Sequence, residues 1–128
     1  MQLSKPVIYV VDDESVIAQT LAVILNQSGF NATAFENPLL ALDAAKDATP
    51  DLLITDVVMP GMTGVDLAIR FRTLYPKCQV LLFSGQSATT ALLEEARGQG
   101  YEFELLAKPV HPTDLLAKLQ GYSQGIPA

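Results

Sequence analysis

Val7-Ile8-Tyr9-Val10-Val11 is a run of five apolar residues, and the acidic residues Asp12-Asp13-Glu14 follow it directly. A short, continuously apolar run rich in valine and isoleucine is typical of a strand buried on both faces, as in a parallel sheet. Runs of the same kind occur at Leu52-Leu53-Ile54 and at Val80-Leu81-Leu82-Phe83. These three runs predict the central strands of one sheet. Ala32 to Phe35 and Phe103 to Ala107 mix in polar residues, and we expect them to be edge strands.

Segments with helical spacing lie between the strands. The first is predicted to bury one stripe and to end at Gly29; the stripe comprises Val16, Ile17, Thr20, Leu21, Ile24 and Leu25. Asn37-Pro38, a cap followed by proline at the first helical position, opens the second helix, over residues 39–46.

The remaining helices have start and stop signals as well. Thr63 and Asp66 form a potential capping box for a third helix, which Tyr75-Pro76 stops; its apolar residues are Leu67, Ala68, Phe71 and Leu74. A fourth is expected from Ser87 to Arg97, ended by Gly98 or Gly100. Pro112 opens a fifth, with Leu115, Leu116 and Leu119 turned inward.

Strand and helix therefore alternate five times. This alternation predicts an α/β fold with a parallel sheet and helices on both faces, and right-handed crossovers leave few topologies. Ligands of such folds bind beyond the carboxyl ends of the strands, where the strand order reverses.

Length and charge limit the classes of function. A chain of 128 residues is expected to form one domain. Eight basic and fourteen acidic residues give a net charge of −6, which argues against binding to nucleic acid or to an anionic membrane surface. Only 17% of the residues are charged, which fits either an apolar face that meets a partner or simply a core rich in alanine and leucine.

Other site types are excluded by residue counts. The single cysteine, Cys78, excludes a disulfide framework and a cysteine-rich zinc site, and the single histidine, His111, excludes a histidine cluster. His111 precedes Pro112 and is expected to be a helix cap or an exposed residue without chemistry. No apolar run approaches the ~20 residues of a membrane helix, and no signal peptide is evident, so we expect a soluble, cytoplasmic protein.

Polar residues follow four of the predicted strands directly: Asp12-Asp13, Asp56, Ser84 and Lys108. All are expected at the same edge of the sheet. Three carboxylates in one crevice repel one another unless a cation joins them, and carboxylate oxygens suit Mg²⁺. Mg²⁺, a lysine, a hydroxyl and an isolated carboxylate are what phosphoryl transfer to a carboxylate requires. Taken singly, each aspartate is as well explained as a turn former or helix cap, and the joint pattern carries the prediction.

Four stretches resemble the receiver domains of two-component response regulators: Val10 to Glu14, Asp56-Val57-Val58-Met59-Pro60-Gly61-Met62-Thr63-Gly64, Ser84-Gly85 and Ala107-Lys108-Pro109. The resemblance covers residues 5–120, as the core of a single receiver domain over residues 1–128. It implies a flavodoxin-like (βα)5 fold, a doubly wound parallel sheet with strand order 2-1-3-4-5.

The resemblance also implies roles for the site residues. Asp56 would accept a phosphoryl group from a phosphohistidine of a sensor histidine kinase or phosphotransfer protein. Mg²⁺ would be held by Asp12 or Asp13, with Asp13 the more direct ligand, by Asp56 and by the backbone carbonyl of Val58. Ser84 would hydrogen-bond the phosphoryl group and Lys108 would pair with it. The Lys108-Pro109 bond resembles the family's cis peptide.

One position departs from the pattern. The family usually has tyrosine or phenylalanine three residues before the lysine, where this chain has Leu105. Phe103 is expected on the same strand face as Leu105 and is a potential substitute. We therefore expect the signal to pass through the Ser84–Ser87 loop and the following helix. The receiving surface would be the face of the fourth helix, fifth strand and fifth helix, where an effector or a second copy binds.

Only residues 121–128 follow the predicted fifth helix, too few for an output domain. We therefore expect a stand-alone receiver, or one excised from a longer regulator, that catalyses only its own phosphorylation and dephosphorylation. Two other interpretations stay open: an interaction module of the same fold that is not phosphorylated, and a small Mg²⁺-dependent phosphohydrolase.

Overall fold

The structure is a computed structural model that describes residues 5–85, 89–108 and 111–125. Its centre is a parallel sheet of five strands in the order β2-β1-β3-β4-β5, which confirms the expected topology. The strands are β1 (Val7–Val11), β2 (Asn31–Phe35), β3 (Leu52–Asp56), β4 (Gln79–Ser84) and β5 (Glu104–Ala107). The two segments of mixed polarity are the edge strands, and the three apolar runs are the central ones.

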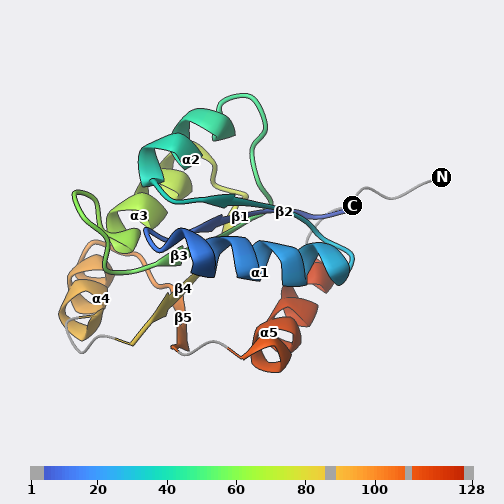
Figure 1. The fold of residues 1–128 in the computed structure, drawn as a ribbon. Helices are drawn as coiled ribbons and strands as arrows, with labels where there is room; N and C mark the ends of the chain where they lie inside the picture. Colours follow the sequence, from blue (N-terminus) through green and yellow to red (C-terminus); the bar gives the residue numbers. More distant parts are fainter. Residues whose placement is uncertain (1–4, 86–88, 109–110, 126–128) are drawn as a thin grey trace.

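Five helices cover the two faces of the sheet (Figure 1): α1 (Ser15–Gln27), α2 (Pro38–Ala45), α3 (Gly64–Leu74), α4 (Thr89–Gly98) and α5 (Pro112–Gly125). Successive residues of each central strand point to opposite faces. In β1, Ile8 and Val10 pack with α1 and α5, whereas Tyr9 and Val11 pack with α2, α3 and α4. The continuous apolar runs therefore supply two cores, one on each side of the sheet.

The core-facing residues of α1 agree only in part with the expected stripe, of which Leu21 and Leu25 are buried and Ile17 packs against the core. Ala18, Leu21, Ala22 and Leu25 are buried, while Val16 is 73% exposed and Thr20 is also exposed. The stripe is rotated toward the two alanines because their small side chains let the helix lie close against the sheet. The expected stop is confirmed, since Gly29 directly follows the last turn with a φ of +97°, a value that glycine adopts without strain.

The predicted caps of α2 and α3 are present. Asn37 accepts a hydrogen bond from the Leu39 N–H, and Thr63 Oγ1 accepts one from the Asp66 N–H at 3.0 Å. Leu67, Ala68 and Phe71 are buried in α3 as expected, but Leu74, the last residue of the helix, is 59% exposed.

The chain around β5 differs from the expectation in one respect. Phe103 lies before the strand rather than in it, so the period of two does not link it to Leu105. Its ring stacks on Tyr101 with centroids 6.1 Å apart, and the Arg72 guanidinium lies 5.6 Å from its centroid. Phe103 is thereby held against α3 and does not take the place of the missing aromatic residue.

The last two helices lie where they are predicted, but α5 continues to Gly125 instead of ending at residue 120. α4 ends at Gly98, one of its two expected stops, whereas Ser87, its expected start, lies outside the described residues. Pro112 begins α5, in which Leu115 and Leu119 are fully buried and Leu116 is half-buried. Among the helices of the described part of the chain, none is both long and apolar enough to cross a membrane.

Candidate functional site

The ends of the strands are aligned by backbone hydrogen bonds that continue the ladders of the sheet. The Asp12 N–H donates to the Phe35 carbonyl, and the Lys108 N–H donates to the Ser84 carbonyl. Because all five strands are parallel, their carboxyl ends meet at one edge. The sheet thus brings the predicted residues from β1, β3, β4 and β5 to the same place.

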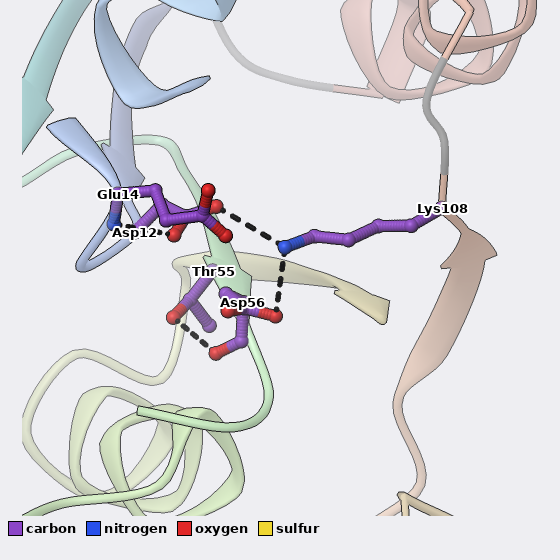
Figure 2. A network of polar contacts seen from close by, with 5 residues as sticks. All are labelled: Asp12, Glu14, Thr55, Asp56 and Lys108. Atoms are coloured by element: carbon purple, nitrogen blue, oxygen red, sulfur yellow. Dashed lines mark hydrogen bonds and ion pairs between the residues drawn. The ribbon is translucent and has the colours of Figure 1, made fainter. Parts of the chain in front are cut away.

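Three carboxylates gather at this edge. Asp12, Asp13 and Asp56 each have a carboxylate oxygen, and these atoms all lie within 4.8 Å of one another. Asp12 is completely buried and Asp56 is 6% exposed, whereas Asp13 is exposed. The Glu14 N–H donates to Asp12 Oδ1 at 2.9 Å, which fixes the Asp12 side chain in the turn between β1 and α1 (Figure 2).

Lys108 follows the edge strand β5, and its side chain extends from there to the acidic cluster. Its Nζ lies 3.4 Å from Asp12 Oδ2 and 3.4 Å from Asp56 Oδ1, so one ammonium bridges the two buried carboxylates (Figure 2). The same Nζ lies 5.1 Å from the centroid of the Phe83 ring, which belongs to the intervening strand β4. The aromatic ring supports the ammonium as it crosses from β5 toward β3 and β1.

Burial raises the pKa of the carboxyl groups of both Asp12 and Asp56. The Lys108 ammonium lowers both values but does not outweigh the loss of hydration. Burial also lowers the pKa of Lys108, but Asp56 and Asp12 outweigh it, and the pKa of the ammonium is raised. The charged form of each of the two carboxyl groups is thus less favourable than it is in water, whereas the charged form of the lysine is more favourable.

This donor set fits a hard divalent cation. Three carboxylate oxygens within a few ångströms are the ligands that Mg²⁺ prefers, and a bound cation would offset the burial that raises the pKa of Asp12 and Asp56. The three side chains form an acidic triad that suits Mg²⁺. Val58 lies two residues after Asp56 in the loop before α3, and the role of its carbonyl as a ligand stays a prediction.

Ser84 ends β4 and is 6% exposed. It pairs with Ala107, the residue directly before Lys108, so the hydroxyl and the lysine belong to neighbouring strand ends.

Pro109 lies outside the described residues, and so does the expected cis bond. His111 is exposed, and its carbonyl accepts the Leu115 N–H in the first turn of α5, in agreement with the expected cap.

Gly64 has a structural role at the site that the sequence interpretation did not assign. Its N–H donates to the Val57 carbonyl at 2.7 Å, and a Cβ on Gly64 would overlap the backbone carbonyl of Asp56. The start of α3 is thereby pressed against the backbone of Asp56. The sequence does contain an indication of this role. Gly64 stands between the cap Thr63 and the first apolar residue of the helix, at a position where no turn requires a glycine.

The family model described as the response regulator receiver domain matches residues 8–120 of this chain. The chain belongs to this family. It is therefore a receiver domain of the two-component type and not a classical enzyme. This agrees with the sheet order and with the acidic residues found at the strand ends.

Individual relatives and structures agree with the family assignment. The chain is 32% identical over 121 residues to the transcriptional regulatory protein CreB of Escherichia coli, covering 92% of this chain and 51% of CreB. It is 32% identical over 118 residues to the DNA-binding transcriptional regulator NtrC of the same species, covering 92% of this chain and 25% of NtrC. The crystal structure of a response regulator receiver domain protein from Clostridium thermocellum superposes with a TM-score of 0.81 at 26% identity, covering 94% and 95% of the two chains.

The chain thus spans about half of CreB and a quarter of NtrC. The similarity concerns the receiver portion of these longer regulators.

Proposed function

We propose that this receiver domain accepts a phosphoryl group on Asp56 from a phosphohistidine of a histidine kinase or phosphotransfer protein. The observation that carries the proposal is the cluster around Asp56, whose carboxylate lies 3.4 Å from the Lys108 ammonium and close to the carboxylates of Asp12 and Asp13. A carboxylate in that position has both a positive charge and a group of cation ligands within reach.

Asp56 is the best placed nucleophile of the three. Asp12 is completely buried, and its side chain already accepts the Glu14 N–H. Asp13 is exposed, and Lys108 pairs with Asp12 and Asp56 instead. Asp56 has a small exposed fraction, through which a donor can approach along the line of attack.

The transfer is a single displacement at phosphorus. A carboxylate oxygen of Asp56 forms the new P–O bond as the P–N bond to the donor histidine breaks, and the leaving imidazole retains the electron pair of that bond. The Lys108 ammonium stabilises the negative charge on the transferred oxygens, and the Ser84 hydroxyl donates a hydrogen bond to one of them. Mg²⁺, held by Asp12 or Asp13, Asp56 and the Val58 carbonyl, would supply the remaining neutralising charge.

The output is proposed to pass through the face formed by α4, β5 and α5. Lys108 directly follows β5, so a shift of its side chain toward a phosphoryl group acts on that strand. Leu105 in β5 is 41% exposed, and Lys118 of α5 pairs with Glu104 of β5 at 2.7 Å. An apolar side chain beside a charged pair is a suitable contact for an effector protein or a second copy of the chain.

The test is the intact mass of the protein after incubation with acetyl phosphate and Mg²⁺. We expect the gain of one phosphoryl group that base or hydroxylamine removes, with no gain when EDTA is present or when Asp56→Asn is used. A stable adduct of the same kind on Asp56→Asn would show that another residue is the acceptor. No adduct on the parent protein would favour an unphosphorylated interaction module, and steady release of phosphate from many small esters would favour a phosphohydrolase.

A further inference from the structure

A pocket of about 370 Å³ lies beside the acidic cluster, between the first turn of α2 and the loop that joins β3 to α3. We call it the α2 pocket. Its wall is mostly apolar and comes mainly from Pro38, Leu39, Met59, Pro60 and Met62, with the acidic residues Asp13 and Glu36 also lining it. The volume lies in the range of roughly 300–1,000 Å³ that is usual for ligand sites. Two methionines give the wall an adaptable surface.

The apolar surface continues outside the pocket onto α2. Leu39 is 59% exposed and its neighbour Leu40 is 54% exposed, because the helix turns Pro38, Ala41 and Ala45 toward the core. Leu40 lines a second hollow, of about 250 Å³, between α1 and α2. Single exposed leucines are ordinary, but two in sequence that border hollows on either side of one helix form a continuous apolar patch.

The charged side chains that line the α2 pocket are both acidic. Asp13 and Glu36 are exposed, and within the described residues neither has an ion-pair partner. No lysine or arginine occurs in the sequence between Lys5 and Lys46. The start of α2 offers little attraction to an anion, because Asn37 Oδ1 already accepts the Leu39 N–H at 2.8 Å.

We infer that the α2 pocket and the adjoining leucines are a docking site for a basic amphipathic segment of a partner protein. The segment would insert an apolar side chain between Leu39 and Met62 and place lysine or arginine next to Asp13 and Glu36. Both carboxylates lie at the border of an apolar hollow, so their attraction for a cation increases as the segment displaces water.

Two other occupants fit the surface less well. A second copy of this chain would bring the same carboxylates together across a two-fold axis, and the net charge of −6 would oppose the approach. A small molecule that filled only the pocket would leave Leu39 and Leu40 largely in water. A segment with an apolar stripe and basic flanks covers the pocket, the leucines and the carboxylates together.

The probe is a pair of synthetic peptides of about 15 residues, long enough to form a marginal helix. Both have leucines at positions i, i+3, i+4 and i+7; one has lysine beside them and the other has glutamate. Each is titrated into the ¹⁵N-labelled protein in buffer without Mg²⁺. We expect the lysine peptide to shift the amides of Glu36, Leu39, Gly61 and Met62 in a saturable manner, and the glutamate peptide to leave them unchanged.

Matched variants separate docking from general attraction. Leu39→Ser and Glu36→Lys should each weaken binding of the lysine peptide about tenfold or more, as is usual for residues at the centre of an interface. Leu74→Ser changes a leucine of the same 59% exposure on α3, and Glu95→Lys changes the net charge equally on α4. These two controls should alter the affinity by no more than about twofold, the scale of a peripheral contact.

The inference is overturned if each variant and its control lose the same affinity, if the glutamate peptide binds equally well, or if the lysine peptide shifts other amides and leaves the pocket unchanged. The docking site shares Asp13 with the proposed Mg²⁺ site, which is why the titration is made without Mg²⁺, but it includes neither Asp56 nor Lys108. Leu39→Ser and Glu36→Lys do not alter Asp56 or Lys108, and their labelling by acetyl phosphate should equal that of the parent. A failed labelling experiment would therefore leave the peptide result intact, and the reverse also holds.

Discussion

The Lys108 ammonium lies 3.4 Å from Asp56 Oδ1, although the two residues follow strands that are not neighbours in the sheet. β4 separates them, and the lysine side chain crosses it above the Phe83 ring. The same nitrogen contacts Asp12, which lies one strand farther away. Lys108 therefore contacts the two buried carboxylates of the cluster, and it competes with any cation for them.

Lys108→Ala is expected to separate metal binding from response. Removing the ammonium leaves the carboxylates to the cation alone, so the Mg²⁺ affinity should stay equal or rise by up to about tenfold. The response to beryllofluoride should be lost, because nothing then links the acceptor oxygens to β5. Mg²⁺ titration followed by backbone chemical shifts measures both effects.

Lys118→Ala is the matched control, since it removes a lysine that pairs only with Glu104 in the described structure. It should preserve both the Mg²⁺ affinity and the chemical shift response of the strand ends. A Lys108→Ala protein that loses Mg²⁺ affinity in proportion to its response would contradict this division of roles.

The acidic cluster is expected to destabilise the folded protein at neutral pH when Mg²⁺ is absent. The pKa values of Asp12 and Asp56 are raised in the folded state by burial, so the folded protein holds these protons more tightly than the unfolded chain does. Their favourable contribution to the free energy of unfolding is complete below the unfolded pKa of about 4 and is lost as pH rises through the folded values.

Asp56→Asn should therefore be more stable than the parent at pH 7 without Mg²⁺, by on the order of 1 kcal/mol, the usual scale for one substitution. The difference should shrink as the pH approaches 4 and shrink again when Mg²⁺ is added to the parent. Urea denaturation at several pH values measures it. Glu95→Gln, an exposed change of the same kind, should show no such dependence on pH, and a constant difference across the range would refute the assignment to burial.

The sequence alone was sufficient to predict the sheet and the meeting of the site residues. Val7 to Val11 and the two similar runs are apolar throughout because both faces of each strand are covered, and this pattern needs no tertiary information. The position of a polar residue directly after such a run also fixes its place at the carboxyl edge. Asp12, Asp56, Ser84 and Lys108 could therefore be assigned to one edge before any distance was known.

Features that depend on packing between helices could not be predicted in this way. The predicted α1 stripe contains the buried Leu21 and Leu25 but lacks Ala18 and Ala22, because alanines carry little hydrophobic weight in the sequence. Phe103 was predicted to lie in the last strand, but β5 begins after it. Its contacts with Tyr101 and Arg72 are tertiary contacts, which the apolar pattern of the segment does not show. The bridge from Lys108 to both Asp12 and Asp56 depends on how far the lysine side chain extends, which no spacing of residues indicates.

Gly64→Ala is expected to disrupt the site from outside the cluster. The added methyl group would meet the backbone carbonyl of Asp56 and the Cα of Val57, neither of which can move without displacing β3. We expect a loss of several kcal/mol, at the upper end of the range for overpacking, and a loss of Mg²⁺ binding in any protein that still folds. Thermal melting and Mg²⁺ titration measure the two effects.

Gly98→Ala is the control for this change, because a Cβ at Gly98 would meet nothing within 4 Å and the residue belongs to α4. It should leave the site unchanged and stabilise the protein slightly, by up to about 1 kcal/mol, since alanine favours the helix more than glycine does. Equal stability of the two variants would mean that the approach of α3 to Asp56 is looser than described.

The last prediction concerns the output of a domain that has leucine in place of the switch aromatic. Leu105 pairs with Leu82 in the sheet and is 41% exposed, so its side chain borders solvent rather than a closed cavity. We expect beryllofluoride with Mg²⁺ to change amide exchange in α4, β5 and α5, by repacking of apolar contacts on that face. A tenfold shift in population requires only about 1.4 kcal/mol, which a few such contacts supply.

Leu105→Tyr tests whether that repacking is sufficient by itself. If the parent already responds on the α4-β5-α5 face, the tyrosine variant should respond there too, with at most a change in amplitude, because the apolar contacts of the strand are retained. Changes in the parent confined to α1 and α2 would contradict the proposed output face. A response that appears only in Leu105→Tyr would show that the leucine of this chain leaves the domain without a working switch, because a ring that leucine cannot imitate must then fill the space beside Ser84.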